Sequence, residues 1–244
     1  MSKIIIPLLL LFMLAGCRDS ANSSESSGSI DEPAVSNEPA AISYTIVNAT
    51  PHDTNSFTEG LLVHDGKLYE SSGAPEDNPV TRSIFGEVDL KTGKIDVKAE
   101  LDRSIYFGEG ITFLNGKVYQ LTWQNKIGFI YDAKTFKKLG QFAIPSAEGW
   151  GMTTDGSSLI LSDGTSNLTF LNPNTFKTEK ILGVTDNNGP VGNINELEYI
   201  KGSIYANIYE SSNIVRIDPV SGKITGKADF SKLNKEVKEK DPQA

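Results

Sequence analysis

A repeated block of short apolar runs and turns constrains this chain more than any other feature of its sequence. Four successive blocks begin at Glu59, Glu109, Trp150 and Asn195, at steps of 50, 41 and 45 residues. In each block an apolar run leads into an Asp-Gly, Asn-Gly or Lys-Gly pair. Asp-Gly and Asn-Gly pairs between apolar runs are typical of β-hairpins, because both turn residues need positive φ. The chain is therefore expected to consist of one strand-rich unit used several times.

Each block holds four expected strands. The first is the apolar run that follows the block start. The second strands are expected at 67–70, 117–120, 159–161 and 203–206, and the third at 84–89, 127–132, 168–172 and 214–218. The fourth begin at Lys94, Lys137, Lys177 and Lys223. Four short strands in roughly 40–50 residues are typical of a β-propeller blade, so the sequence predicts an all-β propeller.

The repeat also predicts where a site lies. The first strand of every propeller blade lines the central channel. Equivalent positions in the four blocks are therefore expected to converge at one mouth of that channel. Phe57 and Phe107, two residues before the glutamates, are expected to face the same way because strand side chains alternate. The prediction is a pocket with two carboxylates, an indole, an amide and two phenyl rings.

The number of blades follows from the strands outside the repeat. We predict a lone strand at 42–47, in the place of an outer strand, and a polar, Lys/Glu-rich segment at 231–244. Four full blades and one strand leave a five-bladed ring three strands short. An open ring would expose unpaired sheet edges. We therefore favour a five-bladed propeller that lacks, in this chain, the C-terminal strands of the last blade, over an open or four-bladed ring.

The N-terminal residues are expected to lie outside the propeller. Residues 1–17 read as a signal peptide, and Leu14-Ala15-Gly16-Cys17 resembles a bacterial lipobox. An ordinary signal peptide is the alternative. Residues 18–41 have the composition of a flexible tether, and 42–244 form the propeller domain. Acylation of Cys17 would place the protein outside the cytoplasm, on the periplasmic or outer-membrane face of a bacterial membrane, with membrane contact through the lipid only.

Composition excludes several function classes. The net charge is −8, with no basic stripe, so nucleic acid is not an expected partner. Cys17 is the only cysteine, and His52 and His64 fall in different loops, so no zinc ligand set is expected. No phosphate-binding glycine loop or nucleophile elbow is present in the sequence. No cofactor is expected to be required, and a structural calcium ion stays open.

The channel residues resemble the plant and bacterial type of glutaminyl-peptide cyclotransferase, a family of five-bladed propellers. The resemblance covers about residues 42 to 230. The matching stretches are Pro51-His52-Asp53, Phe57 to Leu61, Phe107 to Thr112, Leu121-Thr122-Trp123, Gly149 to Met152, Ser162 to Thr165, Asn195 to Tyr199 and Ile214 to Pro219.

The resemblance implies conversion of the N-terminal glutamine of peptides to pyroglutamate, with release of ammonia. It implies that Glu109 is the catalytic glutamate and that Asn195 holds the substrate amide. The implied aromatic lining is Phe57, Phe107, Trp123 and Trp150. Two further implied substrate-binding residues depart from the family: Glu59 stands where plant members carry Gln, and Tyr209 where Trp is usual. The family's C-terminal segments with an active-site lysine would lie beyond Ala244.

Two roles for Glu59 stay open: a second carboxylate could raise the pKa of Glu109 or bind the substrate ammonium. The rival class is a non-catalytic propeller that binds a peptide or partner at the channel mouth. A calcium-stabilised propeller hydrolase is a third reading, and it needs more converging carboxylates than the sequence offers. A binder should tolerate Glu109→Gln, whereas a cyclase should lose turnover and keep its fold.

Overall fold

Each of the four repeated blocks forms one antiparallel sheet in the computed structural model, which describes residues 38–240. We call these sheets blades 1 to 4. Blade 1 contains β2 (Phe57–His64), β3 (Lys67–Gly73), β4 (Ile84–Val88) and β5 (Ile95–Glu100). Blade 2 contains β6 (Gly108–Leu114), β7 (Lys117–Thr122), β8 (Ile127–Asp132) and β9 (Lys138–Ala143). Blade 3 contains β10 (Met152–Thr154), β11 (Leu159–Leu161), β12 (Asn167–Leu171) and β13 (Thr178–Gly183). Blade 4 contains β16 (Ile194–Ile200), β17 (Ser203–Ile208), β18 (Asn213–Ile217) and β19 (Ile224–Asp229).

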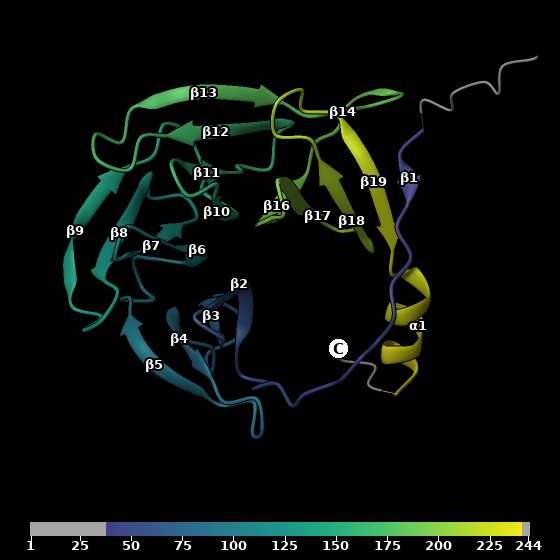
Figure 1. Ribbon diagram of the computed structural model, residues 1–244. Helices are drawn as coiled ribbons and strands as arrows, with labels where there is room; N and C mark the ends of the chain where they lie inside the picture. The colour runs from purple at the N-terminus through teal and green to yellow at the C-terminus, as the bar shows by residue number, and fades with distance from the viewer. Residues whose placement is uncertain (1–37, 241–244) are drawn as a thin grey trace, which may run out of the picture. The chain divides into compact units, whose positions relative to one another are not determined.

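The blades are arranged around a common centre with their first strands innermost (Figure 1). Strand β2 contacts β6, β6 contacts β10, β10 contacts β16, and β16 contacts β2. Within each blade the four repeated strands pair in chain order. The fourth strand is the outermost in blades 1 to 3, whereas in blade 4 a short further strand lies outside β19. The predicted all-β propeller-like fold is therefore confirmed, with four blades among the described residues.

The hairpins between first and second strands have the expected turn chemistry at three of four positions. Asp65, Asn115 and Lys201 have φ of 49°, 51° and 50°, and each is followed by a glycine with positive φ. Blade 3 differs, because a longer loop connects Thr154 to Leu159. The Asp155 carboxylate accepts the main-chain N–H groups of Ser157 and Ser158 and so closes this loop.

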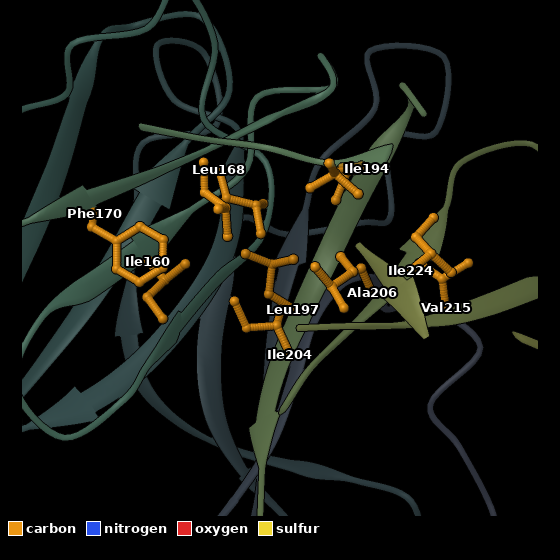
Figure 2. Packing of buried hydrophobic residues seen from close by; sticks show 12 residues of the cluster. Ile160, Leu168, Phe170, Ile194, Leu197, Ile204, Ala206, Val215 and Ile224 are labelled. Atoms are coloured by element: carbon orange, nitrogen blue, oxygen red, sulfur yellow. The ribbon is translucent and has the colours of Figure 1, made fainter. Parts of the chain in front are cut away.

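The hydrophobic core lies between neighbouring blades. One cluster joins blades 1 and 2, a second joins blades 2 and 3, and a third joins blades 3 and 4. Figure 2 shows the third, where Ile160 and Leu168 of blade 3 meet Leu197 and Ile204 of blade 4. Each blade therefore buries its apolar residues against the next blade. A single blade on its own would leave these residues exposed to water.

The predicted strand at 42–47 is wrong. Only β1 (Ala40–Ala41) is a strand in this region, and it pairs in parallel with β19 at the outer edge of blade 4. Residues 42–47 run on without a ladder, and Val47 is 94% exposed. A β-branched run forms a strand only where a neighbouring strand offers hydrogen bonds. Tyr44 instead stacks on Phe230, with ring centroids 4.3 Å apart.

Three elements were not expected from the sequence. A small hairpin follows blade 3, with β14 (Thr185–Asp186) paired to β15 (Gly189–Pro190). The helix α1 (Ser231–Lys240) follows β19 and occupies most of the polar C-terminal segment.

No helix within 38–240 is long and apolar enough to cross a membrane.

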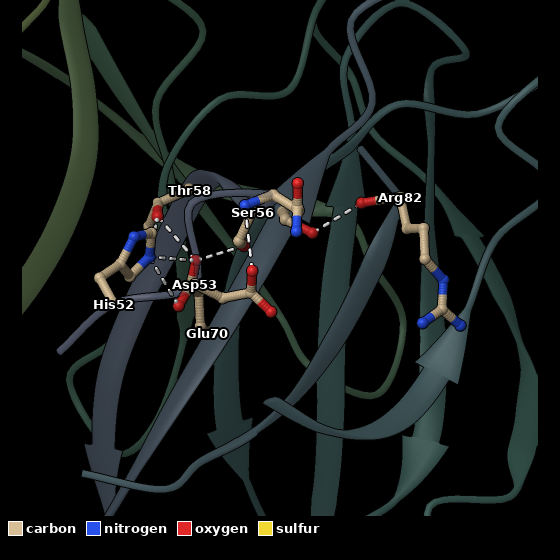
Figure 3. A network of polar contacts seen from close by, with 8 residues as sticks. His52, Asp53, Ser56, Thr58, Glu70 and Arg82 are labelled. Atoms are coloured by element: carbon tan, nitrogen blue, oxygen red, sulfur yellow. Dashed lines mark hydrogen bonds and ion pairs between the residues drawn. The ribbon is translucent and has the colours of Figure 1, made fainter. Parts of the chain in front are cut away.

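The segment before β2 is held by a buried carboxylate. Figure 3 shows His52, Ser56 and Thr58 converging on Glu70 of β3. The Ser56 and Thr58 hydroxyls donate to Glu70 at 2.6 and 2.7 Å, and His52 Nε2 lies 3.0 Å from the same carboxylate. This network fixes the start of β2, which carries two of the predicted site residues.

The predicted signal peptide, the lipobox with Cys17 and most of the predicted tether lie outside the described residues. Of the predicted tether, the structure describes residues 38–41, and Ala40–Ala41 belong to the blade 4 sheet.

Candidate active site

One cavity of about 650 Å³ lies at the centre of the blades. The structure brings all eight predicted pocket residues to its wall: Phe57, Glu59, Phe107, Glu109, Trp123, Trp150, Asn195 and Tyr209. They come from all four blades, from positions up to 152 residues apart between Phe57 and Tyr209 (209 minus 57). The convergence predicted from the repeat is therefore present in the fold.

Bulges in the inner strands place the polar site residues. In β2 the register skips Glu59, because Thr58 pairs with Ser72 and Gly60 with Ser71. One extra residue is likewise accommodated between Gly108 and Ile111 of β6, and between Ile194 and Leu197 of β16. Glu109 and Asn195 lie in these two irregular segments. A bulge bends its strand and re-aims side chains, so three blades use the same device to turn a polar residue toward the cavity.

Glycines beside the bulges let the inner strands approach one another closely. A Cβ added to Gly110 would lie 2.5 Å from the Met152 nitrogen, and one added to Gly151 would lie 2.3 Å from the Asn195 carbonyl oxygen. The Gly110 N–H donates to the Trp150 carbonyl at 2.9 Å. Only residues without a side chain fit at these crossings. The glycines therefore hold the polar site residues of adjacent blades near one another.

The cavity has a buried floor and an aromatic rim. Glu109 is only 5% exposed, whereas Trp123, Phe57 and Tyr209 are 39%, 47% and 51% exposed. The rings form two edge-to-face runs: Phe57 to Phe107 to Trp123, with centroids 6.1 and 5.9 Å apart, and Trp150 to Tyr209, at 5.4 Å. A small side chain that enters past the rim would reach the Glu109 carboxyl in surroundings poor in water.

The electrostatics of the floor favour protonated carboxyls. Burial raises the pKa of Glu109 well above its usual range, and the neighbouring charges of Glu59, Glu196 and Glu148 raise it further. Burial also raises the pKa of Glu59 to about 7. A carboxyl whose pKa is shifted toward neutrality can both accept and give up a proton under ordinary conditions.

Two more carboxyls lie beyond Glu59. A second cavity of about 580 Å³ between β2 and β16 is lined by Glu59, Glu196 and Glu198 together with apolar residues. Burial raises the pKa of Glu196 well above its usual range, and that of Glu198 to about 7. Glu196 Oε1 accepts the Leu61 N–H at 3.2 Å, while its buried Oε2 has no hydrogen-bond partner.

Several residues that shape the cavity were not predicted. Glu148 accepts hydrogen bonds from both site tryptophans, and Arg103 donates to four main-chain carbonyls of the loop that lines one wall. Gly73 and Gly164 lie directly against the rings of Phe107 and Trp150, where an added Cβ would come within 2.1 and 2.6 Å of ring carbons. In the sequence, both glycines follow a serine-containing pair at the end of a second strand, in Ser71-Ser72-Gly73 and Ser162-Asp163-Gly164. This shared pattern could have indicated that the two glycines pack against site rings.

Within residues 38–240, no three His, Cys, Asp or Glu side chains are grouped as metal ligands.

Fold and site together define a propeller with a buried acid at the bottom of an aromatic pocket. Residues 9–244 match the glutamine cyclotransferase family, and the chain belongs to this family.

Two relatives carry the same activity in their names. The chain is 38% identical over 191 residues to a glutaminyl-peptide cyclotransferase of Arabidopsis thaliana. This match covers 78% of the chain, which spans 58% of the length of that relative. The crystal structure of Myxococcus xanthus glutaminyl cyclase is similar with a TM-score of 0.70 and 33% identity, over 78% of each chain. A chain of a nidogen/laminin complex shares the fold alone, at 13% identity and a TM-score of 0.53, over 75% of this chain and 83% of its own.

Proposed function

We propose that the protein is a glutaminyl-peptide cyclotransferase, which converts the N-terminal glutamine of a peptide to pyroglutamate and releases ammonia. The observation that carries the proposal is the buried carboxyl of Glu109 at the floor of an aromatic pocket that also contains Asn195. The activities named for the Arabidopsis and Myxococcus relatives support the same reaction.

In the proposed reaction the glutamine side chain enters past Phe57, Trp123 and Tyr209 and reaches Glu109. The α-amine attacks the γ-carbonyl carbon, so that a carbon–nitrogen bond forms to the amine and the bond to the side-chain nitrogen breaks. Glu109 takes the proton that the amine loses and delivers it to the departing nitrogen, which leaves as ammonia. One group can carry out both transfers because burial raises the pKa of Glu109 and so makes its carboxylate a stronger base than an exposed glutamate.

Asn195 and Glu59 have supporting roles in this proposal. The Asn195 amide donates to the γ-carbonyl oxygen and stabilises the negative charge that develops there. Glu59 lies beside Glu109, and its charge is one of the causes that raise the pKa of Glu109. The aromatic rim holds the first residue of the peptide and keeps water from the floor.

The test compares two peptides that differ only at the amine. The chain is incubated with a short Gln-initiated peptide and with the same peptide N-acetylated, and ammonia release is followed by mass spectrometry. Loss of ammonia from the free peptide alone supports the cyclase. If the free peptide binds and never loses ammonia, the protein is a peptide-binding propeller and the proposal fails.

The proposed complete architecture has five blades. Blades 1–2, 2–3 and 3–4 are joined by hydrophobic clusters, whereas between blades 4 and 1 the described residues leave a cavity, with Leu61 and Ile200 exposed to 42% and 47%. A further sheet between β2–β5 and β16–β19 would cover these residues. A crystal structure in which a hydrophobic cluster joins blades 4 and 1 and closes a four-bladed ring would contradict this proposal.

We further propose that the protein is anchored outside the cytoplasm through acylated Cys17, because a lipobox precedes this residue in the sequence. Incorporation of labelled palmitate into the wild type and not into Cys17→Ser tests the anchor. Catalysis is proposed to need no cofactor, since the proton transfer uses carboxyls of the chain. Dialysis against a chelator should leave the rate unchanged, and a loss restored by a metal ion would contradict this.

A further inference from the structure

Glu148 joins the only two tryptophans of the chain. Its Oε2 accepts the indole N–H of Trp123 and that of Trp150, each at 2.9 Å. Its Oε1 accepts the Gln124 amide at 3.0 Å. The main chain of this segment is held as well, because the Glu148 carbonyl accepts the Ser146 hydroxyl at 2.6 Å and the Gly149 N–H donates to the Trp123 carbonyl at 2.8 Å. One carboxylate therefore spans blades 2 and 3.

This carboxylate lies where the aromatic rim is interrupted. Phe57, Phe107 and Trp123 form one run of edge-to-face rings, and Trp150 and Tyr209 form the other. No ring contact joins the two runs among the described residues. The bond from each indole to Glu148 Oε2 is the connection between them. Trp123 is 39% exposed, so its packing alone restrains it weakly.

A direct catalytic role for Glu148 does not fit its surroundings. Three side-chain donors occupy its two oxygens. Hydrogen bonds from Gln124, Trp150 and Trp123 lower the pKa of Glu148, whereas burial raises the pKa of Glu109. A carboxylate that accepts charge-assisted bonds on both oxygens is suited to hold its donors in place.

We propose that Glu148 is a positioning residue that fixes both indoles in the wall of the peptide pocket and thereby sets the affinity for the first residue of the peptide. The effect on affinity rests on the function proposed above, whereas the effect on the indoles does not. Hydrogen bonds to charged groups are among the stronger ones in proteins, so their loss should be measurable.

The test uses three substitutions. Glu148→Ala removes the hydrogen bonds to both indoles. It is expected to raise KM for a Gln-initiated peptide about tenfold, with kcat changed about threefold or less. Glu148→Gln keeps a carbonyl oxygen that can accept both indole N–H groups, and should keep KM within about threefold. Glu179→Ala is the matched control: Glu179 also accepts two side-chain hydrogen bonds, from Ser158 and Asn172, and is not among the residues that line the pocket.

Tryptophan fluorescence gives a readout that does not depend on turnover. Both tryptophans of the chain are in the site, so the emission and its quenching by acrylamide report on the two indoles alone. Quenching is expected to rise in Glu148→Ala and to stay near wild type in Glu148→Gln and Glu179→Ala. If neither the wild type nor any variant releases ammonia, the cyclase proposal fails. The positioning role still holds in that case if Glu148→Ala shows higher quenching and weaker peptide binding than the wild type.

Wild-type quenching together with wild-type KM in folded Glu148→Ala would overturn the inference. If this variant does not fold by circular dichroism, Glu148→Asp replaces it. Aspartate keeps the charge but is one methylene shorter and cannot reach both indoles, so quenching should again rise. Unchanged quenching in Glu148→Asp would overturn the inference equally.

Discussion

The Ser71 hydroxyl donates a hydrogen bond of 2.5 Å to the main-chain carbonyl of Glu109. This bond connects β3 of blade 1 to the bulge of β6 in blade 2. A chain of buried bonds continues behind it, because Gln120 donates to Ser71 and Tyr131 donates to Gln120. Blade 3 repeats the device, since the Ser162 hydroxyl donates to the Asn195 carbonyl at 2.7 Å. A serine of one blade thus fixes the backbone of the polar site residue in the next.

Ser71→Ala is expected to destabilise the fold by about 1–3 kcal/mol, because it leaves the buried Glu109 carbonyl and the Gln120 amide without partners. Urea unfolding measures the change. Ser157→Ala, in an exposed turn, is the control and should stay within about 0.5 kcal/mol of wild type. A Ser71→Ala protein as stable as the control would show that the bond is dispensable.

Gly151→Ala is expected to cost about 1–3 kcal/mol, since the new Cβ would lie 2.3 Å from the Asn195 carbonyl oxygen and force two inner strands apart. Gly140→Ala is a matched control within β9, where nothing lies within 4 Å of an added Cβ. Thermal unfolding compares the two. Equal melting temperatures would contradict the close packing of blades 3 and 4 at the site.

Glu59→Gln is expected to flatten the dependence of stability on pH. Burial raises the pKa of Glu59 from 4.5 to about 7, so over this range the folded protein holds a proton that the unfolded chain has released. The stabilisation is complete below pH 4.5 and is lost as pH rises through 7. Removing the group should reduce the slope by up to about 1.4 kcal/mol per pH unit.

Urea unfolding between pH 4.5 and 7.5 measures this slope. Glu236→Gln, on the exposed face of α1, serves as the control and should keep the wild-type slope. The same slope in Glu59→Gln would mean that Glu59 is charged in the folded protein throughout this range.

Arg103→Lys is expected to loosen the wall of the pocket. The Arg103 guanidinium donates to the carbonyls of Pro75, Asn78, Pro79 and Thr81, which a single ammonium group cannot match. We expect a loss of about 1–3 kcal/mol in urea unfolding and weaker peptide binding. Arg82→Lys, in an exposed pair with Glu100, should cost less than about 1 kcal/mol. A similar cost for both variants would argue against a special role of Arg103.

Most strands could be predicted because their signals are local. Turn pairs such as Asn115-Gly116 and β-branched runs such as 127–132 mark strand ends and interiors, and β8 (Ile127–Asp132) has the predicted bounds. The prediction at 42–47 failed for the same reason: a local signal cannot say whether a partner strand is present. Helix α1 was missed although Lys232–Glu236 and Lys235–Glu239 have the spacing of helical ion pairs.

Six of the site residues could be predicted from the repeat, and Trp123 and Tyr209 from the family resemblance, but the geometry of the site could not be predicted. Equivalent positions in four blocks predicted a shared pocket that includes Glu109 and Trp150. The bulges at Glu59 and beside Glu109 depend on pairing between strands, which no single stretch encodes. Glu148 was missed because it contacts the indoles of two blades, and its neighbours in sequence give no sign of Trp123.

The most direct test of the account is the rate of ammonia release from a Gln-initiated peptide by Glu109→Gln. The variant keeps the size of the side chain and removes its ability to take up a proton. We expect wild-type circular dichroism, peptide binding by tryptophan emission that is close to wild type, and a rate lower by about 10²–10⁴-fold. A folded Glu109→Gln protein that releases ammonia at the wild-type rate would contradict the assignment of proton transfer to Glu109.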